Sequence, residues 1–308
     1  MIQVERVTKT FQTGDPKSPF VALKELSCQI PSGCIYGLIG ANGAGKSTLM
    51  RLIAGVYRAD GGSVTLDGRA VWENPAAKEQ VVYIPDDLYF LPQSSLLKMA
   101  KLYRALYPRF SWERYHSLVE RFGLDDRVSV GSFSKGMRRQ AATVLGLSAM
   151  PAYLLFDETF DGLDPVMRKL VKQVIYEDIL ERGTTTVITS HSLRELEDTC
   201  DQLALLHQGG IVFESDVQNL KTSMFKVQLA FAEPFGKERF ADFDLVSYEQ
   251  TGSVCNMILR GDREEDERRL RAMKPLICDL LPLNLEEVFI YETEALGYRL
   301  EGKGGKQE

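Results

Sequence analysis

The first two thirds of the chain alternate between short apolar runs and stretches with the hydrophobic spacing of helices. The apolar runs have the length of buried strands and are bounded by Gly, Pro or polar residues; they span residues 34–39, 79–84, 152–156, 184–189 and 202–206. Leu49, Leu52 and Ile53 fall on one face of a helix that follows the first run, and we expect it to extend from Lys46 to about Val56. Strands that alternate with helices predict an α/β fold with a mainly parallel sheet and helical crossovers.

Two further blocks depart from this alternation. Between residues 91 and 149 the spacing is helical and aromatic residues are frequent, which predicts a helical insertion at about residues 88–150. After residue 217, Phe225–Phe231 and Val254–Leu259 alternate like half-buried strands, and the densely charged segment Asp262–Lys274 suits a solvated helix. We therefore expect an N-terminal domain at residues 1–217 and a smaller α+β domain at residues 218–308.

Composition narrows the class of protein. The 308 residues are 44% hydrophobic and 26% charged, an ordinary globular balance that excludes a disordered or collagen-like chain. The net charge of −6 disfavours a partner bound through a basic face, so no nucleic acid is expected. The five cysteines form no CxxC pair, which favours reduced thiols over a disulfide framework or a zinc site. The most apolar stretch, Ala141–Phe156, is too short to span a bilayer, and the N-terminus lacks the apolar region of a signal peptide.

A phosphate-binding loop follows the first predicted strand. Residues 40–47 read GANGAGKS, which fits the pattern G-x-x-x-x-G-K-[ST] between a strand and a helix. The backbone N–H groups of such a loop surround a phosphate, and the N-terminus of the following helix adds positive potential. We expect Lys46 to bind the β- and γ-phosphates, Ser47 to ligate Mg²⁺ and Thr48 to support the α-phosphate. The other expected nucleotide-binding positions are Gly40, Asn42, Gly43, Ala44 and Gly45. A chance glycine-rich turn is the alternative.

Two carboxylates end another apolar strand. Asp157 and Glu158 follow Leu154-Leu155-Phe156, and ligands of open parallel sheets bind at the carboxyl ends of the strands. A nucleotide hydrolase needs one carboxylate for the metal and often a second to orient water. We expect Asp157 to act on Mg²⁺ and Glu158 to be the general base. The alternative is a pair of acids that only cap the strand.

A histidine occupies the equivalent place after the run 184–189. His191 would point from the end of this strand toward the γ-phosphate, and we expect it to be catalytic together with Glu158 and Lys46. Ser192 and Glu195 fit a capping box, so a helix is expected to begin here. A lone histidine more often has a structural or surface role, which is the alternative for His191.

These residues resemble the ATP-binding subunit of an ABC transporter, of a bacterial export type. Residues 133–140 read FSKGMRRQ and are similar to the family's LSGGQ signature, with Ser134 and Gly136 kept. Gly162-Leu163-Asp164 matches the D-loop that follows the carboxylate strand, and Phe11 fits the N-terminal aromatic that stacks on adenine. The resemblance covers residues 1 to about 220. It implies a P-loop NTPase core with an N-terminal antiparallel β subdomain.

The resemblance also implies a mechanism. Two ATPase subunits, identical or related, would enclose two ATP molecules head to tail with Mg²⁺ as cofactor, and Ser134 and Gly136 would touch the ATP held by the other subunit. Ser134 is independently predicted to cap a helix, whose positive end would then face a phosphate. Hydrolysis would drive a separate membrane-spanning permease, which would place the protein at the cytoplasmic face of the membrane as a peripheral subunit.

Several positions depart from the family's pattern, among them the run Thr159-Phe160-Asp161, which replaces the common Pro-Thr-Ser after Glu158. The glutamine that follows a Pro-terminated strand is replaced by Asp86, which could still ligate Mg²⁺ but adds negative charge near a triphosphate. The alternative for Asp86 is a loop acid without a role at the site. In the signature, Lys135 replaces a glycine and Met137 replaces the glutamine.

Export is the expected direction of transport, because Leu285-Glu286-Glu287-Val288-Phe289 resembles a segment near the end of many export-type subunits; an ordinary amphipathic helix is the alternative. The apolar residues Leu88, Tyr89, Phe90 and Leu91 are expected to contact the permease together with the helical insertion. Two other functions stay open: a soluble ABC ATPase that acts on nucleic acid or ribosomes, and a regulatory subunit that binds ATP with little turnover.

Overall fold

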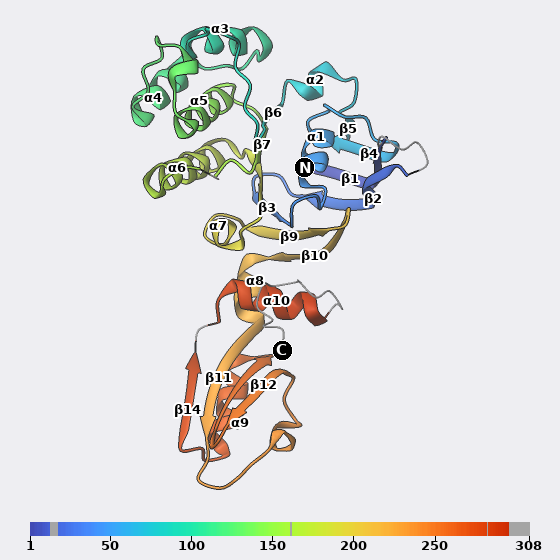
Figure 1. Cartoon of the computed structure of the whole chain (residues 1–308), viewed down its shortest axis with the longest axis vertical. Coiled ribbons are helices and arrows are strands. Elements are labelled where there is room, and N and C mark those ends of the chain that lie inside the picture. The colour runs from blue at the N-terminus through green and yellow to red at the C-terminus, as the bar shows by residue number, and fades with distance from the viewer. Residues whose placement is uncertain (13–17, 161, 282, 296–308) are drawn as a thin grey trace. The chain divides into compact units, whose positions relative to one another are not determined.

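The computed structural model describes residues 1–12, 18–160, 162–281 and 283–295. The chain forms two compact units, residues 1–214 and 215–308, whose elements are labelled in Figure 1. The predicted domain boundary, after residue 217, falls in helix α8 (Val217–Ser223) of the second unit. Among the described residues, no helix has both the length and the apolar character that crossing a membrane requires.

An antiparallel sheet forms the N-terminal part of the first unit. Strand β1 (Ile2–Phe11) pairs with β2 (Phe20–Ile30) on one side and with β4 (Gly61–Leu66) on the other, and β5 (Arg69–Ala70) extends β4. The order is β2-β1-β4-β5. This sheet confirms the antiparallel subdomain that the family resemblance implies.

The central sheet of the first unit contains the strands predicted from the apolar runs. Its order is β10-β9-β3-β8-β7-β6. The strands are β3 (Ile35–Ile39), β6 (Val81–Ile84), β7 (Tyr153–Asp157), β8 (Thr185–Ser190), β9 (Gln202–His207) and β10 (Gly210–Asp216). The pairs β9–β3, β3–β8, β8–β7 and β7–β6 are parallel, which confirms the predicted α/β core. Every residue of β3, β7 and β8 is buried, as expected of strands covered on both faces.

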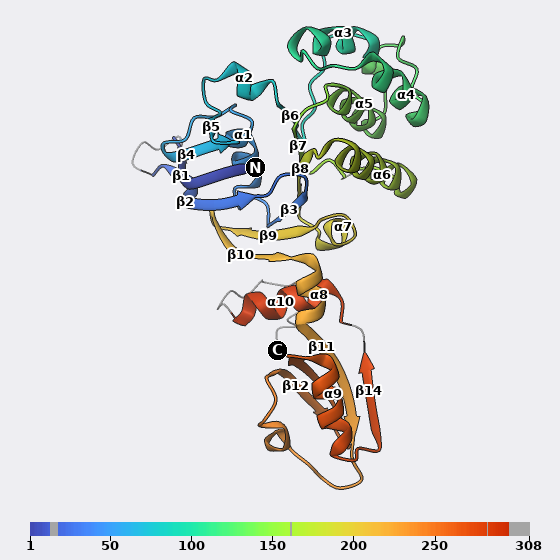
Figure 2. The ribbon, with the colours of Figure 1, turned by 180° about the vertical axis from the view of Figure 1, so that it is seen from behind.

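Helices cover both faces of the central sheet (Figures 1 and 2). Helix α1 (Lys46–Ile53) and the antiparallel sheet lie on one face, whereas α6 (Pro165–Arg182) and α7 (Leu193–Glu197) lie on the other. One apolar cluster joins α1 to both sheets; it includes Val4, Leu23, Leu38, Leu52, Leu155 and Val187. The short helix α2 (Pro75–Lys78) leads into β6. Because β3, β7 and β8 are adjacent and parallel, their carboxyl ends meet at one edge, where a ligand site is expected.

The predicted helical insertion is present in the first unit. It consists of α3 (Leu96–Leu106), α4 (Trp112–Phe122), the short 3-10 helix η1 (Val130–Ser132) and α5 (Lys135–Ser148). Ser95, Ser111 and Ser134 cap α3, α4 and α5 by accepting a backbone N–H, which satisfies donors that the first turn leaves unpaired. From Arg139 to Ser148, α5 is buried at every position, so it is the central helix of this layer.

The second unit is a small α+β domain. Its antiparallel sheet has the order β12-β13-β11-β14, formed by β11 (Met224–Ala230), β12 (Leu245–Thr251), β13 (Val254–Arg260) and β14 (Ile277–Leu281). Alternate residues of β11 and β13 form a core with Phe240 of η2 (Lys237–Phe240) and Leu270 of α9 (Arg263–Ala272). Helix α10 (Leu285–Ala295) contains the predicted export-type segment.

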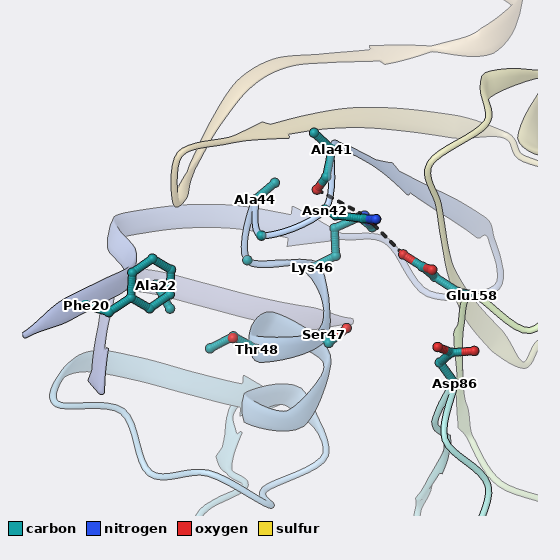
Figure 3. A pocket seen from close by; sticks show the side chains of 12 residues that line it. Phe20, Ala22, Ala41, Asn42, Ala44, Lys46, Ser47, Thr48, Asp86 and Glu158 are labelled. Carbon is teal, nitrogen blue, oxygen red and sulfur yellow. Dashed lines mark hydrogen bonds and ion pairs between the residues drawn. The ribbon is translucent and has the colours of Figure 1, made fainter. Parts of the chain in front are cut away.

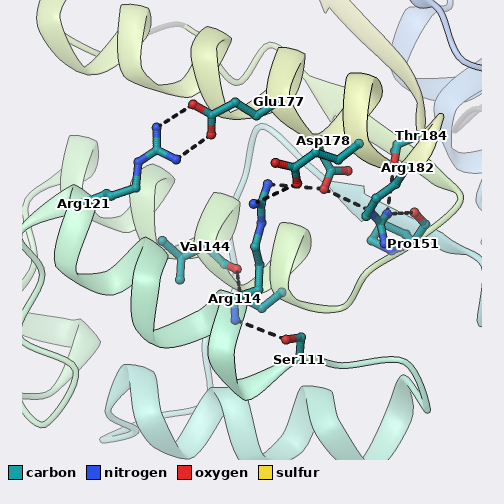
Figure 4. A network of polar contacts seen from close by, with 11 residues as sticks. Ser111, Arg114, Arg121, Val144, Pro151, Glu177, Asp178, Arg182 and Thr184 are labelled. Atoms are coloured by element: carbon teal, nitrogen blue, oxygen red, sulfur yellow. Dashed lines mark hydrogen bonds and ion pairs between the residues drawn. The ribbon is translucent and has the colours of Figure 1, made fainter.

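A polar network ties the helical insertion to α6 (Figure 4). Asp178 of α6 is 1% exposed and accepts from Arg114 of α4 at 3.4 Å and from Arg182 at 3.1 Å. Arg182 also donates to the Pro151 carbonyl and to the Thr184 hydroxyl, at the start of β7 and β8. Because a buried carboxylate needs partners, this network fixes one face of α4 against α6.

A second pair, Arg121 and Glu177, lies beside this network. The guanidinium of Arg121 donates through both terminal nitrogens to the two carboxylate oxygens of Glu177. This hydrogen bonding lowers the pKa of Glu177 below its usual value. A folded-state pKa below the unfolded one gives a contribution that is present at neutral pH and lost as the pH falls through the lowered pKa.

Replacement of Asp178 tests the network. We expect Asp178→Asn to lower the free energy of unfolding by about 2–3 kcal/mol, because two partly buried guanidinium groups lose their shared anion. The matched control is Glu181→Gln on the same helix; Glu181 is 62% exposed and lies 3.7 Å from Arg114, so its loss should change stability by less than about 0.5 kcal/mol. Denaturant unfolding followed by circular dichroism measures both. Equal effects of the two variants would contradict the network.

Candidate nucleotide-binding site

The phosphate-binding loop lies between β3 and α1, as the sequence predicts. Lys46 is the first residue of α1, and Gly45 precedes it with φ 113°, a conformation that favours glycine. Gly40 has no room for a side chain, since a Cβ there would lie 2.5 Å from the Leu206 carbonyl oxygen. The glycines therefore allow a tight turn whose backbone leads into a helix N-terminus.

A cavity of about 210 Å³ opens beside this loop (Figure 3). It is lined by the loop and the first turn of α1, by two residues of β2 and by two acids from other strand ends: Phe20, Ala22, Ala41, Asn42, Gly43, Ala44, Gly45, Lys46, Ser47, Thr48, Asp86 and Glu158. The structure thus brings together seven residues of the loop motif with two of the predicted acids. Gly40 precedes the lining residues and forms the loop's entry.

Lys46 is the central cation of this cavity. Its side chain is 4% exposed, and its ammonium donates to the Gly40 carbonyl at 2.7 Å and to the Ala41 carbonyl at 3.3 Å. It also pairs with Glu158 Oε1 at 3.2 Å (Figure 3). A buried ammonium requires such partners. A phosphate in the cavity would compete with Glu158 for this group.

Glu158 lies at a strained turn directly after β7. Its φ is 49°, which is uncommon for a residue other than glycine. Its N–H donates to the backbone carbonyl of Thr189 at 3.2 Å and to the Thr189 hydroxyl at 3.0 Å. Its Oε2 lies 3.9 Å from His191 Nδ1. The backbone is therefore held by β8 while the carboxylate reaches Lys46 and His191.

Asp157 is held by two hydroxyl groups. The carboxylate is 1% exposed; Oδ1 accepts from Thr189 at 2.7 Å and Oδ2 accepts from Tyr83 at 2.8 Å. Burial and the neighbouring Asp157 charge raise the pKa of Tyr83, so this hydroxyl stays protonated and donates. The parallel register sets Asp157 opposite Thr189, which explains why the two side chains meet.

The acids and Ser47 fit a magnesium ion that arrives with a nucleotide. Among residues 1–12, 18–160, 162–281 and 283–295, no group of three Asp, Glu, His or Cys side chains could hold a metal. Mg²⁺ commonly uses only one or two carboxylates and takes its other ligands from water and phosphates. The Ser47 hydroxyl and the Asp86 carboxylate line the cavity and match that chemistry. Asp157 lies at the adjacent strand end but does not line the cavity, and both of its oxygens accept from hydroxyl groups.

Asp86 connects the cavity to the helical insertion. It lies in the loop after β6, and its side chain is 55% exposed. One oxygen, Oδ1, accepts from Nη2 of Arg139 at 2.6 Å. Arg139 is in α5 and its second terminal nitrogen, Nη1, donates to the Glu158 carbonyl at 3.0 Å.

The signature residues lie outside the cavity. Ser134 caps α5 by accepting the Met137 N–H at 3.2 Å, which confirms the predicted cap. Ser134 is exposed, and neither it nor Gly136 lines the cavity of the same chain.

The predicted capping box at His191 is wrong in its details. Ser192 occupies the N-cap position of α7, but its side chain makes no capping hydrogen bond. The Glu195 carboxylate instead accepts from the Ser190 hydroxyl at 2.7 Å, and Ser190 Oγ accepts the Ser192 N–H at 2.9 Å. Ser190 ends β8, so the residue that organises this turn lies before the histidine. The pattern of Ser192 and Glu195 did not indicate this role, because it considers only the residues from the expected N-cap onward.

The two aromatic residues near the loop have different surroundings. Phe11 does not line the cavity, and its ring packs edge-on against Tyr57 with centroids 5.5 Å apart. Phe20 is directly opposite Phe11 in the β1–β2 pair, is 51% exposed and lines the cavity. Side chains directly opposite each other share one face of a sheet, so the two phenylalanines belong to one surface.

Sequence reasoning missed Tyr83, Thr189, Arg139 and Phe20. Thr189 carries a signal in its position, because it ends the run 184–189 as Asp157 ends its own strand. Arg139 also carries one, since an arginine on a helix that is otherwise buried needs an anion. Tyr83 reaches Asp157, and Phe20 reaches the cavity, because of how neighbouring strands are aligned, and hydrophobic spacing along one segment does not predict that alignment.

Comparisons with known proteins agree with the motifs. The sequence profile of the family described as ABC transporter matches residues 23–161. The chain is 31% identical over 290 residues to the ABC transporter ATP-binding protein YtrB of Bacillus subtilis, covering 94% of this chain and 97% of that protein. It is 30% identical over 214 residues to the daunorubicin/doxorubicin resistance ATP-binding protein DrrA of Streptomyces peucetius, covering 66% and 63%.

Solved structures share the fold. A chain described as the ATP-binding subunit of an ABC transporter superposes with a TM-score of 0.64 at 24% identity, covering 72% of this chain and 92% of that one. A dimeric ATP-binding cassette described as a post-hydrolysis state bound to ADP and Pi has a TM-score of 0.64 at 20% identity, covering 70% and 99%. With its loop motif, its strand-end acids and this near full-length relative, the chain belongs to the family of ABC transporter ATP-binding proteins, whose cassettes are ATPases.

Proposed function

We propose that the chain is the energy-coupling ATPase subunit of an ABC transporter, binding MgATP in the loop cavity and driving a separate membrane-spanning permease from the cytoplasmic face. One observation carries the proposal: the loop backbone, the Lys46 ammonium, the Ser47 hydroxyl and the Glu158 carboxylate converge on a single cavity at the ends of β3 and β7. A phosphate-binding cation next to a positioned carboxylate is what hydrolysis of a triphosphate requires.

Each residue has a role in this proposal. Lys46 and the loop N–H groups bind the β- and γ-phosphates, and Thr48 supports the α-phosphate. Ser47, Asp157 and Asp86 would hold Mg²⁺, which neutralises phosphate charge when bound. Glu158 accepts a proton from the attacking water, and His191, at 3.9 Å from it, orients the γ-phosphate.

The Lys46–Glu158 ion pair gives the proposed base a built-in control. While the ammonium is 3.2 Å from Oε1, part of the carboxylate's capacity to accept a proton is occupied. A γ-phosphate that takes over Lys46 releases Glu158 toward water. The base would then be available when substrate is bound.

A second copy or a related chain would complete the site. Ser134 and Gly136 do not line the cavity of their own chain, yet the exposed end of α5 presents backbone donors and positive potential. We propose that they contact the ATP bound by the other subunit, in a head-to-tail dimer.

The permease would contact an apolar part of the helical insertion. Tyr89 is 77% exposed and Leu91 is 47% exposed in the loop after β6, and Leu106 of α3 is 58% exposed. Exposed apolar side chains mark an interaction surface where they gather into one patch. The loop that carries Tyr89 and Leu91 also carries Asp86, so this part of the proposed contact is continuous in sequence with the cavity.

Export is the proposed direction, supported by the segment at the start of α10 and by the similarity to a drug-resistance ATP-binding protein. One observation favours import instead. The chain is 28% identical over 230 residues to a methionine import ATP-binding protein, MetN, of Protochlamydia amoebophila, covering 71% of this chain and 67% of that protein.

The adenine ring is proposed to lie on the surface formed by Phe11 and Phe20. We expect Phe20→Ala to raise the Kd for ATP about tenfold, because stacking of one base on an aromatic ring contributes about 1–3 kcal/mol. Phe11→Ala should have a comparable effect. Equilibrium binding measures both, and inorganic tripolyphosphate, which lacks a base, is the control ligand. An unchanged Kd for ATP in Phe20→Ala would remove Phe20 from the proposed site.

The catalytic assignment is tested with Glu158→Gln. We expect ATP turnover to fall at least a hundredfold, because a positioned general base contributes roughly 10²–10⁴ in rate, while ATP binding persists. Glu249→Gln, an exposed glutamate of β12 in the second unit, is the matched control and should keep wild-type turnover. Phosphate release is the readout. Turnover of Glu158→Gln equal to that of the wild type would refute the assignment.

The same variant serves as bait for the permease. Glu158→Gln with MgATP, purified from native membranes in mild detergent, should retain a stoichiometric protein with several long apolar spans. Recovery of soluble proteins alone, in more than one detergent, would contradict transport and favour a soluble ABC ATPase.

A further inference from the structure

Arg139 links three parts of the first unit that are far apart in sequence. It is in α5, five positions after Ser134, and its side chain is 1% exposed. Nη2 contacts Asp86, 53 positions away, and Nη1 contacts the carbonyl of Glu158. Among the described residues, its Nε has no hydrogen-bond partner. The guanidinium therefore depends on these two contacts.

Asp86 and Arg139 differ in the cavities that they line. Asp86 lines the nucleotide cavity and also a second cavity of about 240 Å³, whose other lining residues are Asp87, Leu88, Phe133, Lys135, Arg138 and Arg139. Arg139 lines only the second of these cavities. The Asp86 carboxylate thus lies between the nucleotide cavity and a basic cluster on α5, formed by Lys135, Arg138 and Arg139.

We propose that Arg139 is a positioning residue: it is the counter-ion of Asp86, and its charge makes an aspartate tolerable at the rim of a triphosphate site. It neutralises the Asp86 charge and, through its second arm, fixes the peptide of Glu158. An unpaired carboxylate at this rim would repel a nucleotide, and an unpaired guanidinium with one percent exposure would be costly. Each group therefore needs the other: Asp86 without its partner would weaken nucleotide binding, and Arg139 without its partner would lower the stability of the fold.

The contacts of Arg139 also link α5, which follows the signature residue Ser134, to Asp86 and Glu158. Because Ser134 caps α5 and Arg139 lies in its second turn, a displacement of the start of α5 would move Arg139 away from both Asp86 and the Glu158 carbonyl. The inference rests on the proposed nucleotide site only for its binding measurement, whereas the ion pair itself is tested without nucleotide.

The first test is a double-mutant cycle of thermal unfolding without nucleotide. We expect Asp86→Asn to lower Tm by about 3 °C and Arg139→Gln by about 6 °C, the latter because it also loses the Glu158 carbonyl. The double variant should lie near Arg139→Gln, since each single change already breaks the pair. Additive shifts would overturn the ion pair. Asp87→Asn, the adjacent acid that does not line the nucleotide cavity, is the control and should leave Tm unchanged.

The second test measures charge at the rim, through ATP affinity in EDTA, where no metal screens the acids. Arg139→Gln should lower the affinity for Mg-free ATP about tenfold, and Asp86→Asn should raise this affinity. The affinity of the double variant should lie within about twofold of that of the wild type. Arg139→Lys keeps the charge and should restore affinity but not Tm. A purely structural role would leave the affinity of Asp86→Asn unchanged, and that result would refute the proposal.

Failure of the proposed function gives a different pattern. If the wild type binds no ATP, or if Lys46→Ala binds ATP as tightly as the wild type, the proposed nucleotide site is wrong. The double-mutant cycle of thermal unfolding is then the test of the ion pair. If binding depends on Lys46 and Arg139→Gln, Asp86→Asn and the double variant share one affinity for ATP, the inference about Arg139 is wrong and the nucleotide site stands.

Discussion

The turn at Glu158, directly after β7, is the point on which the rest of the nucleotide site depends. Each of its polar groups contacts a different element: the N–H contacts Thr189 of β8, the carbonyl accepts from Arg139 of α5, and the carboxylate pairs with Lys46 of α1. The positive φ of Glu158 is held by these contacts. Parallel strand order makes this possible, because it brings the ends of β3, β7 and β8 to one edge.

Charge balance explains how an acidic chain holds an anionic substrate. The cavity contains one buried ammonium and two lining carboxylates, and each charged group has an opposite partner nearby: Lys46 with Glu158, and Asp86 with Arg139. Asp157 takes part in neither ion pair, because its two oxygens accept hydrogen bonds from the hydroxyl groups of Tyr83 and Thr189. In the proposed cycle, phosphate replaces Glu158 on Lys46, so substrate binding and release of the base are one event.

Local patterns predicted the parts of the site that are local in the chain. The loop at residues 40–48 and the acids after β7 lie within short segments, and the five apolar runs predicted five of the six strands of the central sheet within one or two residues. Strand β10 was not predicted. The contacts Arg139–Asp86 and Tyr83–Asp157 join residues 53 and 74 positions apart, and the placement of Phe20 follows from the register of β1 and β2. Local hydrophobic spacing contains no information on either. The N-terminal sheet was expected only from the family resemblance, because bulges in β1 interrupt its alternation.

In the proposed dimer, two copies of the chain share each closed site: the loop cavity comes from one copy and the end of α5 from the other. Sedimentation of Glu158→Gln with and without MgATP tests this directly. A site shared by two copies predicts a monomer without nucleotide and a species of twice the mass with MgATP. The larger species should be lost in Ser134→Arg, which blocks the exposed end of α5. A monomer under saturating MgATP, or a dimer that persists with Ser134→Arg, would contradict it.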